Sequence, residues 1–151
     1  MVAKGLHLIK IMEKNLLTCG QLERNLAQGI QKLYRQELEH SPSKVTCQLF
    51  GNQLAIVIEN SLTAVEQTLA SNQGLNDTVE KLTSAINQAI EAKLKKLIED
   101  ILSVQVEDIL FDTTIETKRT GAIVALSQLP QVRNPESIPK NNSNKKSEKQ
   151  A

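Results

Sequence analysis

Residues 43–60, SKVTCQLFGNQLAIVIEN, constrain the fold more than any other stretch of the chain. Two runs of alternating apolar and polar side chains flank Gly51-Asn52, a pair suited to a two-residue turn because glycine adopts positive φ at little cost. With this turn, the numbers of opposed residues sum to 103. One face of the predicted hairpin is then apolar and the other is mixed, and a slip of one residue would destroy that separation. The apolar face consists of Val45, Cys47, Leu49, Leu54, Ile56 and Ile58.

Two capping boxes predict where helices begin on either side of this hairpin. Thr18 and Gln21 form the first, at the start of a helix that runs to about residue 38. Thr63 and Glu66 form the second, at the start of a short helix that ends near residues 71–74. The buried stripe of the first helix is predicted to contain Leu22, Leu26, Ile30, Leu33 and Tyr34.

A longer helix follows, with Asn76 or Asp77 as its cap, and then two more strands. Strand patterning returns in residues 104–112 and 120–128, and residues 113–119 between them are predicted to form a loop too long for a tight turn. The expected fold is α+β: a two-layer sandwich in which an antiparallel sheet of about four strands is covered by two long helices and one short helix. The apolar stripe of the longer helix is predicted to contain Val79, Leu82, Ile86, Ala89, Ile90, Leu94, Leu97 and Ile101.

Residues 18–129 form the predicted domain, between two ends of different character. Residues 1–17 are basic and amphipathic; they could lie on a membrane surface, or extend the next helix or cap the core. The second reading is favoured, because three lysines on four turns are a weak membrane signal. Residues 130–151 are dominated by Pro, Asn, Ser and Lys and are predicted to be a disordered polar tail.

Charge and hydropathy argue against nucleic-acid binding and a membrane span. The chain has 18 basic and 17 acidic residues, but residues 131–151 hold five basic and two acidic ones, which leaves a net charge of −2 on the rest. A phosphate-backbone binder relies on clustered positive charge. The longest apolar runs, LAIVI and AIVAL, are far shorter than a membrane span, and no signal-peptide pattern opens the chain. We therefore expect a cytoplasmic protein without a transmembrane segment.

No catalytic, cofactor-binding or metal-ligating constellation is found. His7 and His40 lack the spacing of a zinc site. Cys47 falls on the apolar face of the hairpin and is expected in the core, whereas Cys19 follows a helix cap, where the macrodipole could lower its pKa and leave a reactive thiol. Four acidic residues straddle a helix end and a strand start, so a solvated face is favoured over a cation site. They are Glu99, Asp100, Glu107 and Asp108.

Polar residues at the strand ends are the remaining candidates for a site. If the two hairpins are neighbours, they gather at one end of the sheet. Strands commonly end in polar residues, and this is the favoured explanation; a surface that docks a partner is the alternative. The candidates for such docking are Lys44, Glu59, Asn60, Arg119 and Thr120.

Three segments resemble the MpsC family, named for a sodium-translocating membrane-potential-generating system. They are GQLERNLAQGIQKLYRQEL, SPSKVTCQLFGNQLAIVIENSLTAVEQTL and ILFDTTIETKRTGAIVAL, and the resemblance covers about residues 19–129. Its most specific pieces are residues 20–23, the PSK before the first strand, and residues 59–63.

The resemblance implies association, through partner subunits, with a membrane system that handles sodium or inorganic carbon, and it implies no defined catalytic residues. We therefore expect a soluble, non-enzymatic accessory or interaction protein, homo-oligomeric, cytoplasmic and held at the membrane only through partners. The alternative is a homodimeric nucleoid- or RNA-associated regulator, whose binding would weaken steeply with salt. An enzyme is the third possibility.

Overall fold

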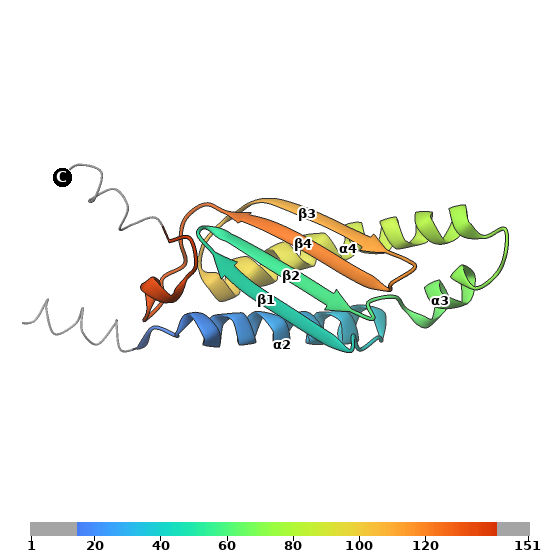
Figure 1. Ribbon diagram of the computed structural model, residues 1–151. Helices are drawn as coiled ribbons and strands as arrows, with labels where there is room; N and C mark the ends of the chain where they lie inside the picture. The colour runs from blue at the N-terminus through green and yellow to red at the C-terminus, as the bar shows by residue number, and fades with distance from the viewer. Residues whose placement is uncertain (1–14, 142–151) are drawn as a thin grey trace, which may run out of the picture.

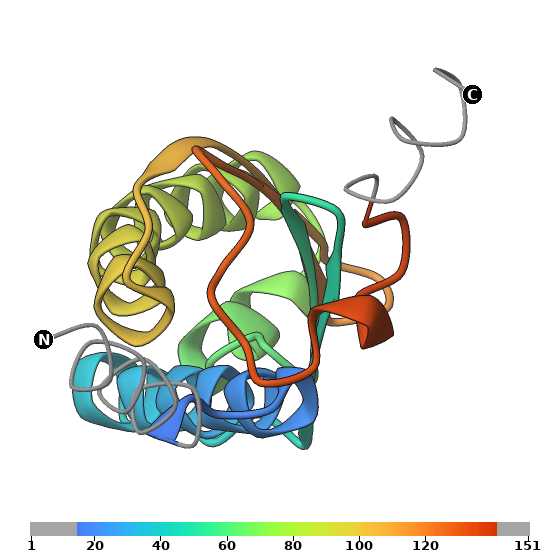
Figure 2. The ribbon, with the colours of Figure 1, turned by 90° about the vertical axis from the view of Figure 1, so that its left-hand side faces the viewer.

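The computed structural model describes residues 15–141, which form a four-stranded antiparallel sheet with helices on one face (Figure 1). The strands are β1 (Lys44–Phe50), β2 (Gln53–Glu59), β3 (Val106–Thr114) and β4 (Arg119–Leu126), in the spatial order β1-β2-β4-β3. Figure 2 shows the two long helices on the same side of the sheet. The fold is therefore the predicted two-layer α+β sandwich.

The register predicted for the first hairpin is confirmed. Val45 pairs with Ile58, and the remaining pairs follow at steps of one residue as far as Phe50 and Gln53. Gly51 has a φ of +56°, which supplies the turn. Because β2 also pairs with β4, the two hairpins are neighbours in one sheet.

The helices begin at the two predicted capping boxes. In α2 (Cys19–Leu38) the side chain of Thr18 accepts a hydrogen bond from the amide of Gln21, and the Gln21 side chain accepts one from the amide of Thr18. Thr63 and Glu66 make the same reciprocal pair at the start of α3 (Ala64–Ala70). Each box satisfies amides that a helix start would otherwise leave unpaired, which contributes about 1 kcal/mol. Helix α3 lies beyond the end of the sheet and packs on α4 (Asn76–Leu102).

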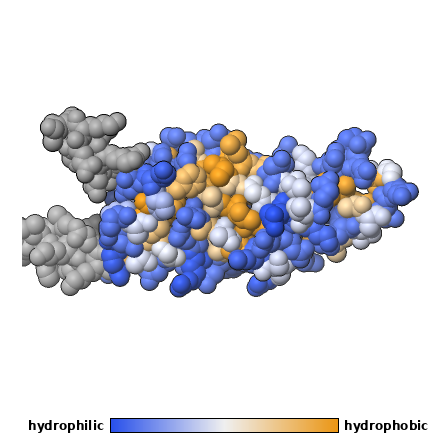
Figure 3. All heavy atoms as spheres, in the orientation of Figure 1, coloured by the Kyte–Doolittle hydropathy of each residue, from blue (hydrophilic) through white to orange (hydrophobic). Residues whose placement is uncertain are grey.

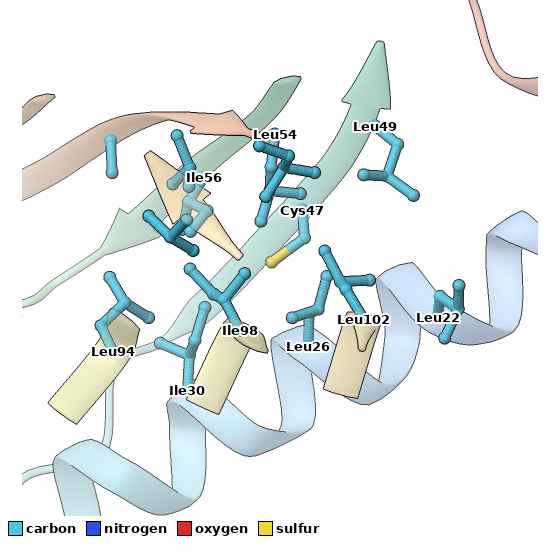
Figure 4. Close-up of a cluster of buried hydrophobic side chains, with 14 of the residues drawn as sticks. Leu22, Leu26, Ile30, Cys47, Leu49, Leu54, Ile56, Leu94, Ile98 and Leu102 are labelled. Atoms are coloured by element: carbon cyan, nitrogen blue, oxygen red, sulfur yellow. The ribbon is translucent and has the colours of Figure 1, made fainter. Parts of the chain in front are cut away.

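The core lies between the inner face of the sheet and helices α2 and α4 (Figure 4). Cys47 is 8% exposed and belongs to this core, as its place in the hairpin predicted. Gly29 lets the helices approach closely, since a Cβ there would lie 3.1 Å from Leu97 Cδ1 of α4. The side chains labelled in Figure 4 come from both helices and both strands of the first hairpin: Leu22, Leu26, Ile30, Cys47, Leu49, Leu54, Ile56, Leu94, Ile98 and Leu102.

Helix α4 departs from the sequence prediction at both ends. Its N-cap is Leu75, which makes no side-chain capping bond, so the expected cap at Asn76 or Asp77 is wrong. In its C-terminal half Ile98 and Leu102 are buried, whereas the predicted Leu97 and Ile101 are only partly buried. Apolar residues occupy both sets of positions, so the pattern could not choose between the two faces.

The predicted long loop between β3 and β4 is also wrong. Both strands extend into residues 113–119, and Thr113 and Thr114 pair with Thr120 and Arg119. Only residues 115–118 form the turn, which is closed by a 3.2 Å hydrogen bond from the amide of Lys118 to the carbonyl of Ile115. Lys118 adopts a φ of +57°, a left-handed conformation that the sequence signals for turns associate with Gly or Asn.

The predicted disorder of the tail is wrong for its first part. Val132 and Ile138 are buried in the core, and a short 3₁₀ helix, η1 (Pro135–Ser137), lies between them. The carbonyl of Pro139 accepts a 2.6 Å hydrogen bond from the amide of Gly51, which ties this segment to the β1–β2 turn. Buried apolar side chains and hydrogen bonds thus hold this segment against the domain, although its composition is polar. Residues 142–151 of the predicted tail, and residues 1–14 of the predicted N-terminal extension, lie outside the described residues.

Candidate functional site

Three of the predicted docking residues form one row across the sheet. Lys44 of β1 pairs with Glu59 of β2, which in turn pairs with Arg119 of β4. All three side chains project from the outer face, opposite the helices. An Arg119 Nη2 lies 3.4 Å from Glu59 Oε1, and the two side chains are 55% and 40% exposed. An ion pair this exposed contributes less than about 1 kcal/mol, so the row is a charged surface rather than a stabilising bridge.

Asn60 follows Glu59 of this row, and its role is to turn the backbone. It has a φ of +53°, a conformation that asparagine tolerates better than most residues, and it turns the chain from β2 toward α3. Its carbonyl lies 2.6 Å from Nε2 of His40, so that ring nitrogen donates. On the other side of the turn, the amide of Ser61 donates to the carbonyl of Lys118 at 2.9 Å. The structure therefore explains Asn60 by chain geometry.

Thr120 does not belong to the exposed surface. It is 1% exposed and faces the helices, so its prediction as a docking residue is wrong. Its Oγ1 lies 2.7 Å from Ser61 Oγ and 2.7 Å from Thr113 Oγ1, and Asn87 Nδ2 donates to Thr113 at 2.9 Å. This hydroxyl chain links the connection between β2 and α3 to β4, β3 and α4 at the end of the otherwise apolar inner face.

A buried carboxylate, Glu66, lies next to the hydroxyl chain, and its burial was not predicted from the sequence. Glu66 is 2% exposed, and Thr83 of α4 donates to its Oε2 at 2.6 Å while Thr63 donates to its Oε1 at 2.9 Å. Tyr34 of α2 is also buried; burial raises its pKa, a hydrogen bond with Thr120 opposes the shift, and the charge of Glu66 adds to it. The capping box marked Glu66 only as a helix-start residue.

Both cysteine thiols among the described residues are buried. Burial raises the pKa of the Cys47 thiol to about 12, and burial together with the charge of Glu23 raises the pKa of Cys19. Both thiols are therefore protonated near neutral pH, which disfavours the reactive thiol considered at Cys19. Between residues 15 and 141 no three His, Cys, Asp or Glu side chains converge as metal ligands. Glu99 instead accepts a 3.0 Å hydrogen bond from the amide of Val106 at the start of β3.

Two open grooves flank the β3–β4 turn. One, of about 590 Å³, lies between α3, the start of α4 and the turn, and Leu62, Gln67 and Lys118 line part of it. The other, of about 550 Å³, runs between α4 and β3. Lys118 Nζ donates to Gln67 Oε1 at 3.3 Å across the first groove.

An apolar patch occupies the centre of the outer sheet face. In the orientation of Figure 1 this face points toward the viewer, and Figure 3 shows apolar atoms in its middle with hydrophilic atoms around them. Val57 is 39% exposed, Ile123 is 42% exposed and Leu110 is 64% exposed. These three side chains come from β2, β4 and β3. We call them, together with Ala55 and Ala125 beside them, the outer patch.

Comparison with known proteins gives one match. The model of the family described as "Na+-translocating membrane potential-generating system (MpsC)" matches residues 18–128. No curated protein and no solved structure matches the chain. Among the helices between residues 15 and 141, none has the length and apolar character that a membrane span requires.

Proposed function

The chain belongs to the MpsC family, and from this membership we propose that it is a non-enzymatic accessory protein of a sodium-dependent membrane-potential-generating system. The observation that carries the proposal is the family match, which extends from the cap of α2 to the end of β4 and so includes every strand of the sheet. Membership suggests a role in such a system, and the accessory role is our proposal for this chain.

The surface features support a binding role. The outer patch exposes large apolar side chains, which in soluble domains commonly marks a place of contact. The row formed by Lys44, Glu59 and Arg119 borders this patch with both signs of charge. Charged residues around an apolar centre are the usual anatomy of a protein interface. We propose that the Lys44 end of this row docks subunits of the membrane system, that the outer patch serves self-association, and that the protein works at the cytoplasmic side of the membrane as a homo-oligomer.

The chemistry of the described residues supports a non-enzymatic role. Cys19 and Cys47 are buried with raised thiol pKa values, and the ring of His40 is held by the Asn60 carbonyl. The buried Glu66 already accepts hydrogen bonds on both oxygens. If the protein is an enzyme or a small-ligand sensor, a broad metabolite panel should contain compounds that raise its unfolding temperature; we expect none.

Affinity purification from the native cell tests the proposal. The tagged full chain, extracted in mild detergent, should recover an integral membrane protein. Lys44→Glu should reduce that recovery because it reverses an exposed charge in the row, whereas Lys96→Glu, an exposed reversal on α4, should leave it unchanged.

Two outcomes would contradict the proposal. Recovery of nucleic acid, lost steeply between low and physiological salt, would favour the nucleoid- or RNA-associated alternative. Recovery of the chain alone would exclude the accessory role. Equal recovery of the membrane protein with Lys44→Glu and Lys96→Glu would show that the row is not the docking site.

A further inference from the structure

We infer that the outer patch binds a second copy of this chain, in a two-fold dimer that stacks the two sheets face to face. The inference rests on the self-association proposed above and does not depend on the membrane system. Its evidence is the pairing of residues across the two central strands, β2 and β4, on the outer face.

Each row across these strands joins two unlike side chains. Glu59 lies beside Arg119, and Val57 lies beside Gly121, which has no side chain. The next row joins the small Ala55 to the large Ile123, and the last joins Gln53 to Ala125. In every row the two side chains differ: one pair is opposite in charge, and in the other pairs a large side chain lies beside a small one.

A two-fold axis parallel to the strands, between β2 and β4, converts this pattern into self-complementarity. It lays β2 of each copy over β4 of the other, row for row. Ile123 then lies over Ala55 of the second copy, and Val57 lies over Gly121, so large side chains fill the space above small ones. Glu59 lies over Arg119 of the second copy, so the charged row meets its opposite sign. Sheets stacked in this way keep their strands within about 30° of each other.

The edge strands agree with the same axis. It places β1 of one copy over β3 of the other, so Lys44 lies over Thr114, at the rim of the contact. Leu110, the most exposed member of the outer patch, then lies over the aliphatic part of Gln48 and beside Phe50. An axis perpendicular to the strands would instead lay Glu59 over Gln53 and Arg119 over Ala125, so it would lose the pairing of opposite charges between the copies.

The size of the face indicates a reversible dimer. Four strands spaced about 4.8 Å apart, with about seven residues at about 3.3 Å each, project to roughly 440 Å² per copy. A stable complex typically buries about 800 Å² of accessible surface per partner. We therefore expect a weak association that depends on protein concentration rather than an obligate dimer.

Sedimentation velocity of the full chain tests the dimer. Over low to several hundred micromolar protein, the mass should rise from 16.7 kDa toward twice that value. Ile123→Lys introduces unpaired charges into the contact and should raise the dissociation constant at least about tenfold without changing the urea midpoint of the dilute protein. Val65→Lys is the matched control, because Val65 is 62% exposed on α3 and lies away from the outer patch.

Cross-linking tests the axis. If the two-fold axis is parallel to the strands, the Gln53 residues of the two copies lie in the same row, and their backbones are about 10 Å apart across the stacked sheets. A short bismaleimide should therefore join two chains of Gln53→Cys but not of Ser84→Cys, an exposed position on α4. Cys19 and Cys47 are buried and should not compete.

The outcomes separate the possibilities. A wild-type chain that stays monomeric throughout would refute both the self-association and its surface. A dimer that Ile123→Lys and Val65→Lys weaken equally, or not at all, would refute the surface alone. A dimer sensitive to Ile123→Lys in which Gln53→Cys fails to cross-link would refute the axis. None of these results bears on recovery of a membrane protein, so failure of the accessory role is seen separately.

Discussion

The hydrogen bond from Thr83 to Glu66 joins α4 to the start of α3, and Thr83→Val isolates its contribution. Thr83 is 5% exposed and Glu66 is 2% exposed, so water does not readily replace a lost donor. The Thr83 hydroxyl donates to Glu66 Oε2 at 2.6 Å, while Thr63 supplies both donors to Oε1. Valine has nearly the shape of threonine and removes only the donor.

The expected cost follows from the charge of the acceptor. A hydrogen bond to a charged group contributes about 1.5–3 kcal/mol, and a buried charged acceptor left without its donor retains its desolvation penalty. We therefore expect Thr83→Val to lower the free energy of unfolding by about 2 kcal/mol. With a urea m-value of about 2 kcal/mol/M, the midpoint should fall by about 1 M.

Urea denaturation of dilute protein, followed by circular dichroism, measures this cost. Thr83→Ser is the control, because it keeps the hydroxyl, loses one methyl group and should cost about 1 kcal/mol or less. In a Glu66→Gln background the Thr83→Val penalty should shrink, since the acceptor is no longer charged. The reasoning is refuted if Thr83→Val costs no more than Thr83→Ser, or costs the same in both backgrounds.

Three further predictions concern stability. Burial raises the pKa of Cys47 to about 12, so the unfolded thiol ionises first and stability falls above about pH 9. Cys47→Ala should therefore reduce the loss between pH 9 and pH 10.5 by up to about 1.4 kcal/mol per pH unit in urea titrations, and an unchanged slope would contradict the assignment. Gly51→Ala should cost about 1–2 kcal/mol in the same assay, because Gly51 has a φ of +56° and the added Cβ would lie 3.3 Å from the carbonyl oxygen of Lys140. Gly20→Ala, in helix α2 with open space around it, should be neutral or stabilise by about 0.5 kcal/mol, and equal effects of the two changes would count against the strain. Ile138→Ala should cost at least about 2 kcal/mol, and a cost below about 0.5 kcal/mol would mean that the segment does not pack as described.

The sequence predicted most where local chemistry decides the structure. The first hairpin has one turn that suits Gly51, and one register that separates its faces, so every pair could be assigned. The capping boxes at Thr18 and Thr63 satisfy their own helix starts, so they too are readable without tertiary context. The candidate row was predictable for the same reason, since Glu59 is the last residue of β2 and Arg119 is the first residue of β4, and the two hairpins bring these strands together.

The rest depends on contacts between distant residues. Glu66 can be buried because Thr83, 17 residues away, donates a hydrogen bond to it, and no local sequence pattern predicts that contact. Thr120 is a polar residue near the end of a strand, where exposed side chains are common. It faces inward because the strand register places it among other hydroxyl groups. Ile138 packs on the core from within a polar stretch whose overall composition is typical of disorder.

The sodium dependence of the membrane potential in the native cell tests the central claim most directly. The potential, measured with a voltage-sensitive dye as external sodium is raised, should lose its sodium-dependent component when the gene for this chain is deleted. The wild-type chain should restore that component, Lys96→Glu should restore it equally, and Lys44→Glu should restore it less. A sodium-dependent component that survives deletion unchanged would contradict a role of this chain in generating the potential.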